Sequence, residues 1–429
     1  MAGRLRVLVL AYMISPRRGT EFAVAWNYVQ VMRRHCDLTI LYGSAGEHMG
    51  QYDDFTEPTF IDRHPDGDVE FRFVPEPPLA HRLNALNRRG FLTYSFYLAY
   101  RAWHRAVLDH ARRLVAERKY DLIHYVGPIG YREPGDLWRL PLPYVWGPIG
   151  GATSFPWRFR SGMSSKGLVR LMIRSAGNAL QLHVGRRVDR ALHRTDVLLT
   201  ATTENQTIFR RLKGVDSIYL PENGIDGDIR LNGTKFPIDC VRIVWIGSLE
   251  ARKGLTLLLQ AVARMPDRRG LTINVVGDGP DRTALQKQAM ETGIAEHIVW
   301  HGRVPRTTVM TLLDDAHLHV ITGLNEANTT SVWEALGRSV PVLALDHCGM
   351  HDVVQPPYGI RVPLIDVEGT INGIAVALRS LVDDPARLEA MARSCAAACE
   401  RFRIEHRAPV LLDAYQTAIT RFHGRGATS

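Results

Sequence analysis

Short apolar runs alternate with longer amphipathic segments along most of the chain. The short runs fit buried strands of a parallel sheet, and the longer segments fit the helices that connect such strands. In the first half this pattern predicts strands at 6–11, 37–42, 69–74, 122–125, 144–145 and 197–200, and helices at 22–34 and 98–117.

The alternation stops near residue 225 and then starts again. The second series predicts strands at 241–246, 272–276, 298–300, 318–321 and 340–344, and helices at 255–264 and 282–290. Two series of this kind predict an α/β protein with two Rossmann-like, doubly wound domains. We expect an amino-terminal domain at 1–220, a carboxyl-terminal domain at 221–405, and a last helix within 406–429 that crosses back to the first domain.

The two halves of the chain differ in net charge. The 429 residues carry a net charge of +9, and 45% of them are apolar, which is ordinary for globular proteins and excludes disordered and collagen-like chains. Residues 1–200 hold 28 basic and 18 acidic side chains, whereas 201–429 hold 25 and 26. Within the basic half, 151–200 alone has nine basic against two acidic residues.

The basic and apolar residues of 157–194 are interleaved. This pattern predicts peripheral contact with an anionic membrane or with a lipid-diphosphate acceptor, although a solvated arginine-rich helix explains it equally well. No aromatic platform or recognition module accompanies the charge, so we expect no nucleic-acid partner.

Cysteine usage and hydropathy bear on the compartment. Five cysteines, an odd number without a Cys-x-x-Cys pair, are typical of a reduced, cytoplasmic protein. The apolar start at 7–14 is short for a signal peptide and is interpreted as a first buried strand. No apolar stretch reaches the length of about 18 residues that a membrane span needs. We therefore expect a cytoplasmic protein, with or without peripheral contact at the inner face of the membrane.

Ligands of doubly wound sheets bind beyond the carboxyl ends of the strands. The most informative loop there is 322–349, which contains Glu326 and, eight positions later, Glu334. Thr329, Thr330 and Ser331 precede an apolar helix, where hydroxyl groups can cap the helix and its free N–H groups can hold an anion. Glu334 can accept hydrogen bonds from a ribose diol, and Glu326 can reach sugar hydroxyls. Taken alone, the segment fits simple capping residues and a surface glutamate as well.

Four other segments accompany this loop. The segment 247–254, GSLEARKG, follows a strand and opens a helix, so Arg252 and Lys253 can meet a diphosphate. PENGID at 221–226 is an interdomain turn, and VGDGP at 276–280 and HGRVP at 301–305 follow the next strands.

These five segments, in their order along the chain, resemble the retaining nucleotide-sugar glycosyltransferases of the large group 1, or family-four, type. That family includes phosphatidylinositol mannosyltransferase, sucrose-phosphate synthase and many polysaccharide enzymes. The resemblance covers the carboxyl-terminal half and implies the GT-B fold, in which two Rossmann-like domains face each other across a cleft. It also implies that the carboxyl-terminal domain holds most of the donor.

The resemblance implies roles for individual residues. The catalytic candidates are Glu326, Lys253, Arg252 and His124, although a buried structural histidine explains His124 equally well. The donor-binding candidates are Gly19, Thr20, Gly247, Ser248, Gly277, Arg303, Val304, Ala327, Asn328, Thr329, Thr330 and Glu334. The acceptor-side candidates are Glu21, Gly147, Gly150 and Gly151, which lie in the segments RRGTEFAVAW at 17–26 and WGPIGG at 146–151. A tight turn between a strand and a helix explains the second segment equally well.

Three positions depart from the family pattern. Ser248 stands where the family usually has arginine, and Val126 stands where it often has a second histidine after His124. The first glutamate is followed by residues 327–329, Ala-Asn-Thr, instead of Gly-Phe-Gly. The phosphate contacts are therefore expected from Thr329 and Thr330.

The function expected from the resemblance is retaining transfer of a sugar from a nucleotide-diphosphate sugar, with UDP favoured, to a hydroxyl acceptor. Cell-surface glycan or lipid-linked sugar assembly is the first expectation, and a small secondary metabolite such as a cyclitol, aminosugar or aglycone is the alternative acceptor. A nucleotide-sugar 2-epimerase, a phosphorylase and a binding-only relative remain as other classes. We expect no metal or cofactor, because the two Asp-Gly-Asp segments at 66–68 and 226–228 are typical of turns.

Overall fold

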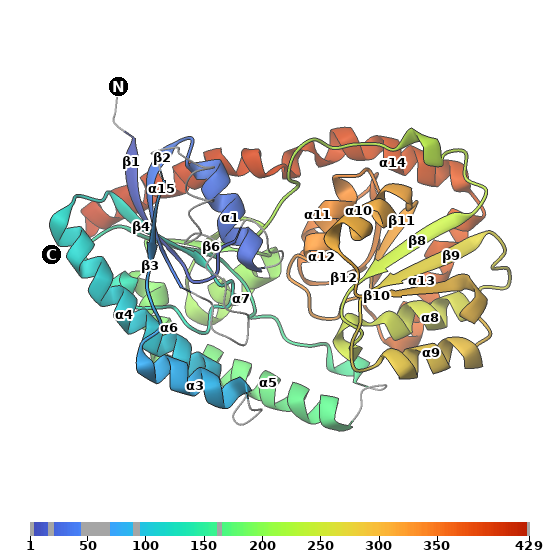
Figure 1. Ribbon diagram of the computed structural model, residues 1–429, viewed down its shortest axis with the longest axis horizontal. Coiled ribbons are helices and arrows are strands. Elements are labelled where there is room, and N and C mark those ends of the chain that lie inside the picture. Colours follow the sequence, from blue (N-terminus) through green and yellow to red (C-terminus); the bar gives the residue numbers. More distant parts are fainter. Residues whose placement is uncertain (1–3, 16–20, 44–68, 89–94, 161–164, 427–429) are drawn as a thin grey trace. The chain divides into compact units, whose positions relative to one another are not determined.

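The computed structural model describes residues 4–15, 21–43, 69–88, 95–160 and 165–426, which form two compact units (Figure 1). The first unit comprises 1–152, 179–223 and 404–429, and the second comprises 153–178 and 224–403.

The first unit contains a seven-stranded parallel sheet in the order β3-β2-β1-β4-β5-β6-β7. Its strands are β1 (Leu5–Ala11), β2 (Cys36–Tyr42), β3 (Val69–Phe73), β4 (Leu122–Gly127), β5 (Tyr144–Ile149), β6 (Val197–Thr200) and β7 (Ser217–Tyr219). Its helices are α1 (Glu21–Met32), α3 (Pro78–Arg88), α4 (Ser95–Glu117), α6 (Arg186–Arg194), α7 (Thr203–Lys213) and α15 (Arg407–Gly426). The sheet order reverses between β1 and β4, which is where such sheets form ligand sites.

The second unit repeats this plan with six parallel strands in the order β10-β9-β8-β11-β12-β13. The strands are β8 (Val241–Ile246), β9 (Leu271–Val276), β10 (Ile298–Gly302), β11 (Leu318–Ile321), β12 (Val342–Asp346) and β13 (Gly359–Pro363). The helices are α8 (Leu255–Ala263), α9 (Arg282–Glu291), α10 (Arg306–Asp315), α11 (Thr330–Leu336), α12 (Cys348–Val353), α13 (Val367–Val382) and α14 (Pro385–Cys399).

Both faces of the second sheet are covered, which explains its apolar strands. Ile243 and Trp245 of β8 pack in one core with α8, α9 and α13, whereas Val244 packs in another with α10, α11 and α12. Figure 1 shows these two helix layers on either side of the strands. Successive strand residues point to opposite faces, so a strand buried on both sides reads as a continuous apolar run.

Three strands differ from the sequence prediction. Strand β5 runs to Ile149 and therefore includes part of the segment 146–151 that was expected to be a loop. A register shift between Trp146 and Ile149 accommodates this extension. The prediction missed β7 and β13, because both are short edge strands without a long apolar run.

The expected first domain, 1–220, contains a segment that the structure groups with the second unit, namely 153–178. Phe155 and Phe159 are buried in the core formed around α8, α9 and α13. Thr153 also donates a hydrogen bond to the Asn325 side chain at 3.3 Å, and Arg158 donates to the Ile365 carbonyl at 3.2 Å. These contacts correct the predicted boundary.

Helix α15 belongs to the first unit, although it follows the second in the sequence. Its apolar residues share one core with α1 and with one face of the first sheet. Helix α5 (Ser165–Val184) is long, but no helix within the described residues is long and apolar enough to cross a membrane.

Candidate active site

Backbone loops pack closely against one another at the carboxyl ends of the strands of the second sheet. Gly277 has a φ of +130°, and an added Cβ would lie 1.9 Å from the carbonyl oxygen of Gly247. Gly349 passes so close to Ala327 that a Cβ would lie 1.5 Å from its carbonyl oxygen. Only glycine fits such positions without displacing the neighbouring backbone. The loops after β8, β9, β11 and β12 are therefore held together at the carboxyl ends of the strands.

Glu326 is the centre of an ion-pair cluster in these loops. Its Oε1 atom lies 2.7 Å from Lys253 Nζ and 3.0 Å from Arg252 Nη1. Arg252 also pairs with Glu250 at 2.6 Å. The backbone supports this arrangement, because Leu324 donates a hydrogen bond to the Arg252 carbonyl at 2.9 Å. Three of the four catalytic candidates thus meet at one place.

Glu334 forms a second ion pair, with Arg306 of α10, at 3.0 Å. Burial raises the pKa of the Glu334 carboxyl, and the nearby charge of Arg306 opposes that rise. Arg306 thereby favours the ionised form, which is the form that accepts two hydrogen bonds from a diol. The sequence prediction missed Arg306, because it lies in a polar helix start without a motif.

The start of α11 differs from the expected cap. Thr329 is the N-cap residue, but its side chain makes no capping hydrogen bond. Its hydroxyl instead lies 2.9 Å from the hydroxyl of Ser331, and Ser331 lies 3.1 Å from Nε2 of buried His319. The Nδ1 atom of His319 lies 3.0 Å from the Val244 carbonyl oxygen, which can only accept a hydrogen bond, so Nδ1 carries the hydrogen and donates it. The hydrogen-bond direction is therefore Thr329 to Ser331 to His319 to Val244.

His319 was also missed by the sequence prediction. Burial lowers its pKa to about 4, so the ring is neutral at neutral pH. A neutral ring that donates through Nδ1 accepts through Nε2, and it therefore fixes the Ser331 hydroxyl. The only sequence signal was a histidine within the apolar run LHVI.

The other donor-side candidates have mixed environments. Ser248, in the place of the family's arginine, has its hydroxyl 3.5 Å from the Asp278 carbonyl. Arg303 is exposed and Val304 is half-buried. Asn328 is buried and Thr330 is half-buried at the first position of α11. Gly19 and Thr20 lie outside the described residues.

The acceptor-side glycines belong to the first unit. Gly147 has a φ of +126°, and a Cβ there would lie 2.2 Å from the Leu199 carbonyl oxygen, so its role is a close approach between β5 and β6. Gly150 donates a hydrogen bond to the Ile129 carbonyl at 2.8 Å. Gly151 is exposed, with a φ of +83° and open space beside it. Helix α1 begins at Glu21, whose side chain lies outside the described residues.

Of the two readings of His124, the structure favours the buried structural histidine. The residue has no exposed surface, and burial lowers its pKa to about 3. Nε2 donates to the Gly147 carbonyl at 2.8 Å, and Nδ1 accepts from the Tyr415 hydroxyl at 2.8 Å. Tyr415 in turn lies 2.6 Å from the Tyr28 hydroxyl. His124 therefore joins β4, β5, α15 and α1 in the core and is a positioning residue.

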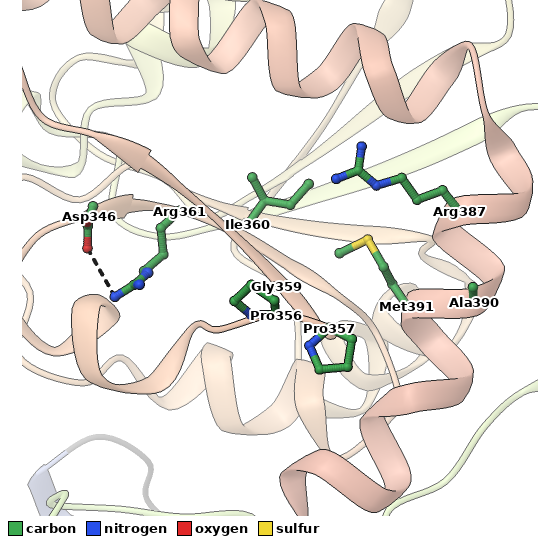
Figure 2. Close-up of a pocket in the computed structure, with 9 residues that line it drawn as sticks. All are labelled: Asp346, Pro356, Pro357, Gly359, Ile360, Arg361, Arg387, Ala390 and Met391. Atoms are coloured by element: carbon green, nitrogen blue, oxygen red, sulfur yellow. Dashed lines mark ion pairs between the residues drawn. The ribbon is translucent and has the colours of Figure 1, made fainter.

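A separate cavity of about 580 Å³ lies in the second unit at the free edge of β13, and no predicted site residue lines it. Figure 2 shows Arg361 directed toward Asp346, with which it pairs at 3.4 Å, and Arg387 and Met391 extending from α14. Arg361 also donates to the His351 carbonyl at 2.8 Å. The charge of Arg361 is thus already balanced, and the cavity adds nothing to the candidate site.

Comparison with known proteins gives a consistent picture. Residues 235–397 match the family described as glycosyl transferases, group 1. A 2-deoxystreptamine glucosyltransferase of Streptomyces kanamyceticus is 26% identical over 179 residues, which are 41% of this chain and 46% of that protein. A D-inositol 3-phosphate glycosyltransferase of Nocardia farcinica is 28% identical over 194 residues, 43% of this chain and 42% of that protein. The chain thus spans less than half the length of these curated relatives.

Solved structures match over almost the whole chain. The Anabaena protein Alr3699/HepE in complex with UDP and glucose superimposes with a TM-score of 0.59 and 14% identity, covering 96% of this chain and 100% of that one. At this identity the likeness shows the fold alone. The fold is GT-B, with two Rossmann-like units.

Proposed function

We propose that the chain, whose residues 235–397 match the glycosyl transferases group 1 family, transfers a sugar from a nucleotide-diphosphate sugar to a hydroxyl acceptor. The proposal includes transfer with retention of configuration, a UDP-sugar as donor, and no requirement for a metal or cofactor. The likeness to a structure that holds UDP and glucose supports the choice of donor.

The observation that carries the proposal is the cluster of Lys253, Arg252 and Glu326 at the carboxyl ends of β8 and β11. Within the described residues, both cations contact the same oxygen, Oε1, of Glu326. The second oxygen, Oε2, is left to accept a hydrogen bond from a sugar hydroxyl. Glu326 thus holds two cations next to the position that we assign to the sugar. Negative charge develops on the diphosphate when its bond to the sugar breaks, and the two cations are placed to stabilise that charge.

The chemistry asked of the protein is mainly electrostatic. The leaving phosphate takes the proton of the acceptor hydroxyl, so no separate protein base is needed at the reacting face. Fixed cations in a partly buried site stabilise the developing negative charge more than they would in water. Lys253 and Arg252 supply those cations, and Thr329, Thr330 and the free N–H groups at the start of α11 supply further donors. Glu334, whose ionised form Arg306 favours against the effect of burial, accepts from the ribose diol.

Donor turnover of two variants tests these assignments. Lys253→Ala removes one of the two cations, and we expect kcat to fall by about 100-fold or more, as when a donor to a developing oxyanion is lost. Glu334→Gln should mainly raise the KM for the donor, because it removes a ground-state contact. Lys287→Ala and Glu296→Gln are matched controls, since both residues are exposed on the same unit. Unchanged kinetics in both test variants would contradict the site.

A panel of hydroxyl compounds tests which acceptor receives the sugar. The relatives are named for 2-deoxystreptamine and D-inositol 3-phosphate, which supports including small hydroxyl acceptors beside lipid-linked sugars. Nucleotide release is measured with and without each acceptor. Release that depends on an acceptor is the expected result. Release without any added acceptor would instead indicate that water takes the sugar, as in a hydrolysing 2-epimerase, and release that requires inorganic phosphate would indicate a phosphorylase.

We also propose that α5 contacts an anionic membrane surface. Its apolar side chains Val169, Met172, Ile173, Leu180 and Val184 are 49–64% exposed. Their spacing of three, four and seven residues places them on one face of the helix. Exposed arginines precede and follow the helix in the sequence, at 158, 160, 186, 190 and 194. An apolar helix face with flanking cations is typical of helices that lie in the membrane interface.

Vesicle co-sedimentation tests the membrane proposal. The double variant Val169→Glu, Ile173→Glu should lose binding to vesicles that contain phosphatidylglycerol, because two charges enter the apolar face. Val376→Glu is the matched control, since Val376 is 69% exposed on α13, away from α5. Equal binding by the double variant and the control would contradict the proposal and would leave the transferase assignment unaffected.

A further inference from the structure

The first unit contains a cavity of about 280 Å³ on the flank of its sheet, between α4, the short 3-10 helix Leu137–Arg139 and the start of α6. Five arginines line it, namely Arg101, Arg105, Arg112, Arg139 and Arg187. All of them belong to the first unit, whereas the donor-side candidates Lys253, Arg252 and Glu334 belong to the second.

The carboxylates around this arginine pocket do not balance its positive charge. Asp109 and Asp136 are the acidic residues that line it, so five guanidinium groups face two carboxylates. Arg112 pairs with Asp109 at 3.2 Å, and Arg139 pairs with Asp136 at 3.2 Å. These two ion pairs balance the charges of Arg112 and Arg139, and the charges of Arg101, Arg105 and Arg187 remain.

Arg187 is partly neutralised from behind the pocket. It contacts Asp136 at 3.2 Å, which it shares with Arg139, and Glu133 at 2.6 Å. Burial raises the pKa of Glu133 to about 7, so this carboxyl is only partly ionised at neutral pH. The pair with Glu133 therefore cancels only part of the Arg187 charge.

Arg101 and Arg105 form no hydrogen bond or ion pair with any part of the chain that the structure describes. They are four residues apart on α4, so their side chains lie on the same face of the helix, and both are exposed. Like charges at this spacing destabilise a helix. A bound anion would remove the repulsion between these side chains.

The chemistry of the pocket points to a phosphate group. Guanidinium groups bind phosphate through two parallel hydrogen bonds, and several arginines favour a ligand with more than one negative charge. Leu108 is the one apolar residue among those that line the pocket, so a base or an acyl chain would find little surface there. We propose that this pocket binds a phosphate group with at least two negative charges, of which inorganic diphosphate is the simplest example.

Calorimetric titration with inorganic diphosphate, at constant ionic strength, tests the proposal. The double variant Arg101→Gln, Arg105→Gln should bind diphosphate about 100-fold or more weakly, because two charged hydrogen bonds to the anion are lost. Both side chains are exposed and unpaired within the described chain, so the variant should keep its fold, which circular dichroism checks. Arg113→Gln is the matched control, since Arg113 lies on the same helix but does not line the pocket.

Diphosphate can also bind at the donor site, and Lys253→Ala separates the two sites. Retained binding in Lys253→Ala and in Arg113→Gln, with loss in the double variant, supports the arginine pocket. Equal binding by the wild type and the double variant overturns it, as does a loss confined to Lys253→Ala. Because the double variant leaves the donor cluster intact, its outcome is independent of the transferase assignment.

The phosphate can come from a soluble ester or from a lipid headgroup. Co-sedimentation with vesicles that contain phosphatidic acid, whose phosphomonoester headgroup can carry two negative charges, distinguishes these two sources. Weaker sedimentation of the double variant than of Arg113→Gln identifies a headgroup, and equal sedimentation with weaker diphosphate binding identifies a soluble ligand. No difference in either measurement overturns the proposal.

Discussion

The two units use the same hydrogen-bond arrangement at equivalent strands. Strand β4 lies beside β1, and β11 lies beside β8, so each is the first strand across the reversal of its sheet. Each carries one fully buried histidine, His124 or His319. In both cases a hydroxyl donates to a second hydroxyl, which donates to the imidazole, which donates to a backbone carbonyl.

The difference lies in what each arrangement holds. The arrangement in the first unit begins at Tyr28 and Tyr415 and ends at Gly147, so it joins two helices to the sheet core. The one in the second unit begins at Thr329 and Ser331, which stand at the start of α11 beside the loop of Glu326. The same chemistry therefore serves structure in one unit and positions candidate donor-binding hydroxyls in the other. Residue type alone does not distinguish these roles.

The largest expected effect is a loss of stability in acid. Burial lowers the pKa of His319 from 6.5 to about 4, so between these values the unfolded chain binds a proton that the native ring does not. This contribution to stability is present above the ordinary pKa and is lost as the pH falls toward the lowered one, a loss of about 3 kcal/mol at about pH 4. The variant His319→Gln lacks the titrating group and should lose less stability on acidification.

Urea unfolding of the wild type and of His319→Gln at about pH 7 and about pH 4 measures this effect. The gap in unfolding free energy between them should narrow by about 3 kcal/mol in acid. His81→Gln, at an exposed histidine of the first unit, should show no such change. Parallel pH curves for the wild type and His319→Gln would contradict the buried, neutral ring. The same experiment with His124→Gln tests the buried histidine of the first unit, whose pKa is lowered by burial to about 3.

The next effect concerns the hydroxyl in the middle of the first arrangement. Tyr415→Phe keeps the buried ring but leaves Tyr28 and His124 without this partner, so we expect a loss of about 1–3 kcal/mol in unfolding free energy. Tyr144→Phe is the matched control, because Tyr144 is equally buried and its hydroxyl has no hydrogen-bond partner within the described chain. Thermal or urea unfolding should show the control to be neutral or stabilising. Equal losses in both variants would contradict the proposed link.

The sequence predicted most strands, because their environment is encoded locally. Strand β8 was predicted with the bounds that the structure shows, since a continuous apolar run is what burial on both faces requires. Strand β13 contains Gly359, Arg361 and Pro363 and lies at an edge, so its sequence resembles a loop. The move of 153–178 to the second unit depends on burial of Phe155 and Phe159, which no local pattern shows.

The candidate site was predicted where the sequence carries a motif. Lys253, Arg252 and Glu326 were predicted through the family pattern, and the fold brings them together although Arg252 and Glu326 are 74 positions apart. The sequence left two readings of His124 open, because its burial depends on Tyr415, which lies 291 positions later. Arg306 and His319 were missed because their roles come from side chains that only the folded chain brings near them.

The smallest expected effect separates the two arrangements by function. Ser331→Ala removes the hydroxyl that His319 holds and leaves Thr329 without this partner. If the start of α11 binds the donor, the KM for the nucleotide sugar should rise about five-fold, which corresponds to about 1 kcal/mol, the value of one hydrogen bond. The cations Lys253 and Arg252 remain in place, so kcat should change less than KM. Ser394→Ala is the control, because that hydroxyl donates within α14, to the Met391 carbonyl.

Comparison of Ser331→Ala with Tyr415→Phe then decides whether the two arrangements differ as proposed. Ser331→Ala should change donor KM and also lower stability, because Ser331 is buried and its loss leaves Nε2 of His319 without this partner. Tyr415→Phe should lower stability with the donor KM unchanged, because its hydroxyl lies in the core of the first unit. A shift of donor KM in Tyr415→Phe, with none in Ser331→Ala, would reverse the assignment and give the site role to the His124 arrangement. The change in donor KM relative to the change in unfolding free energy, compared between the two variants, therefore distinguishes the two arrangements.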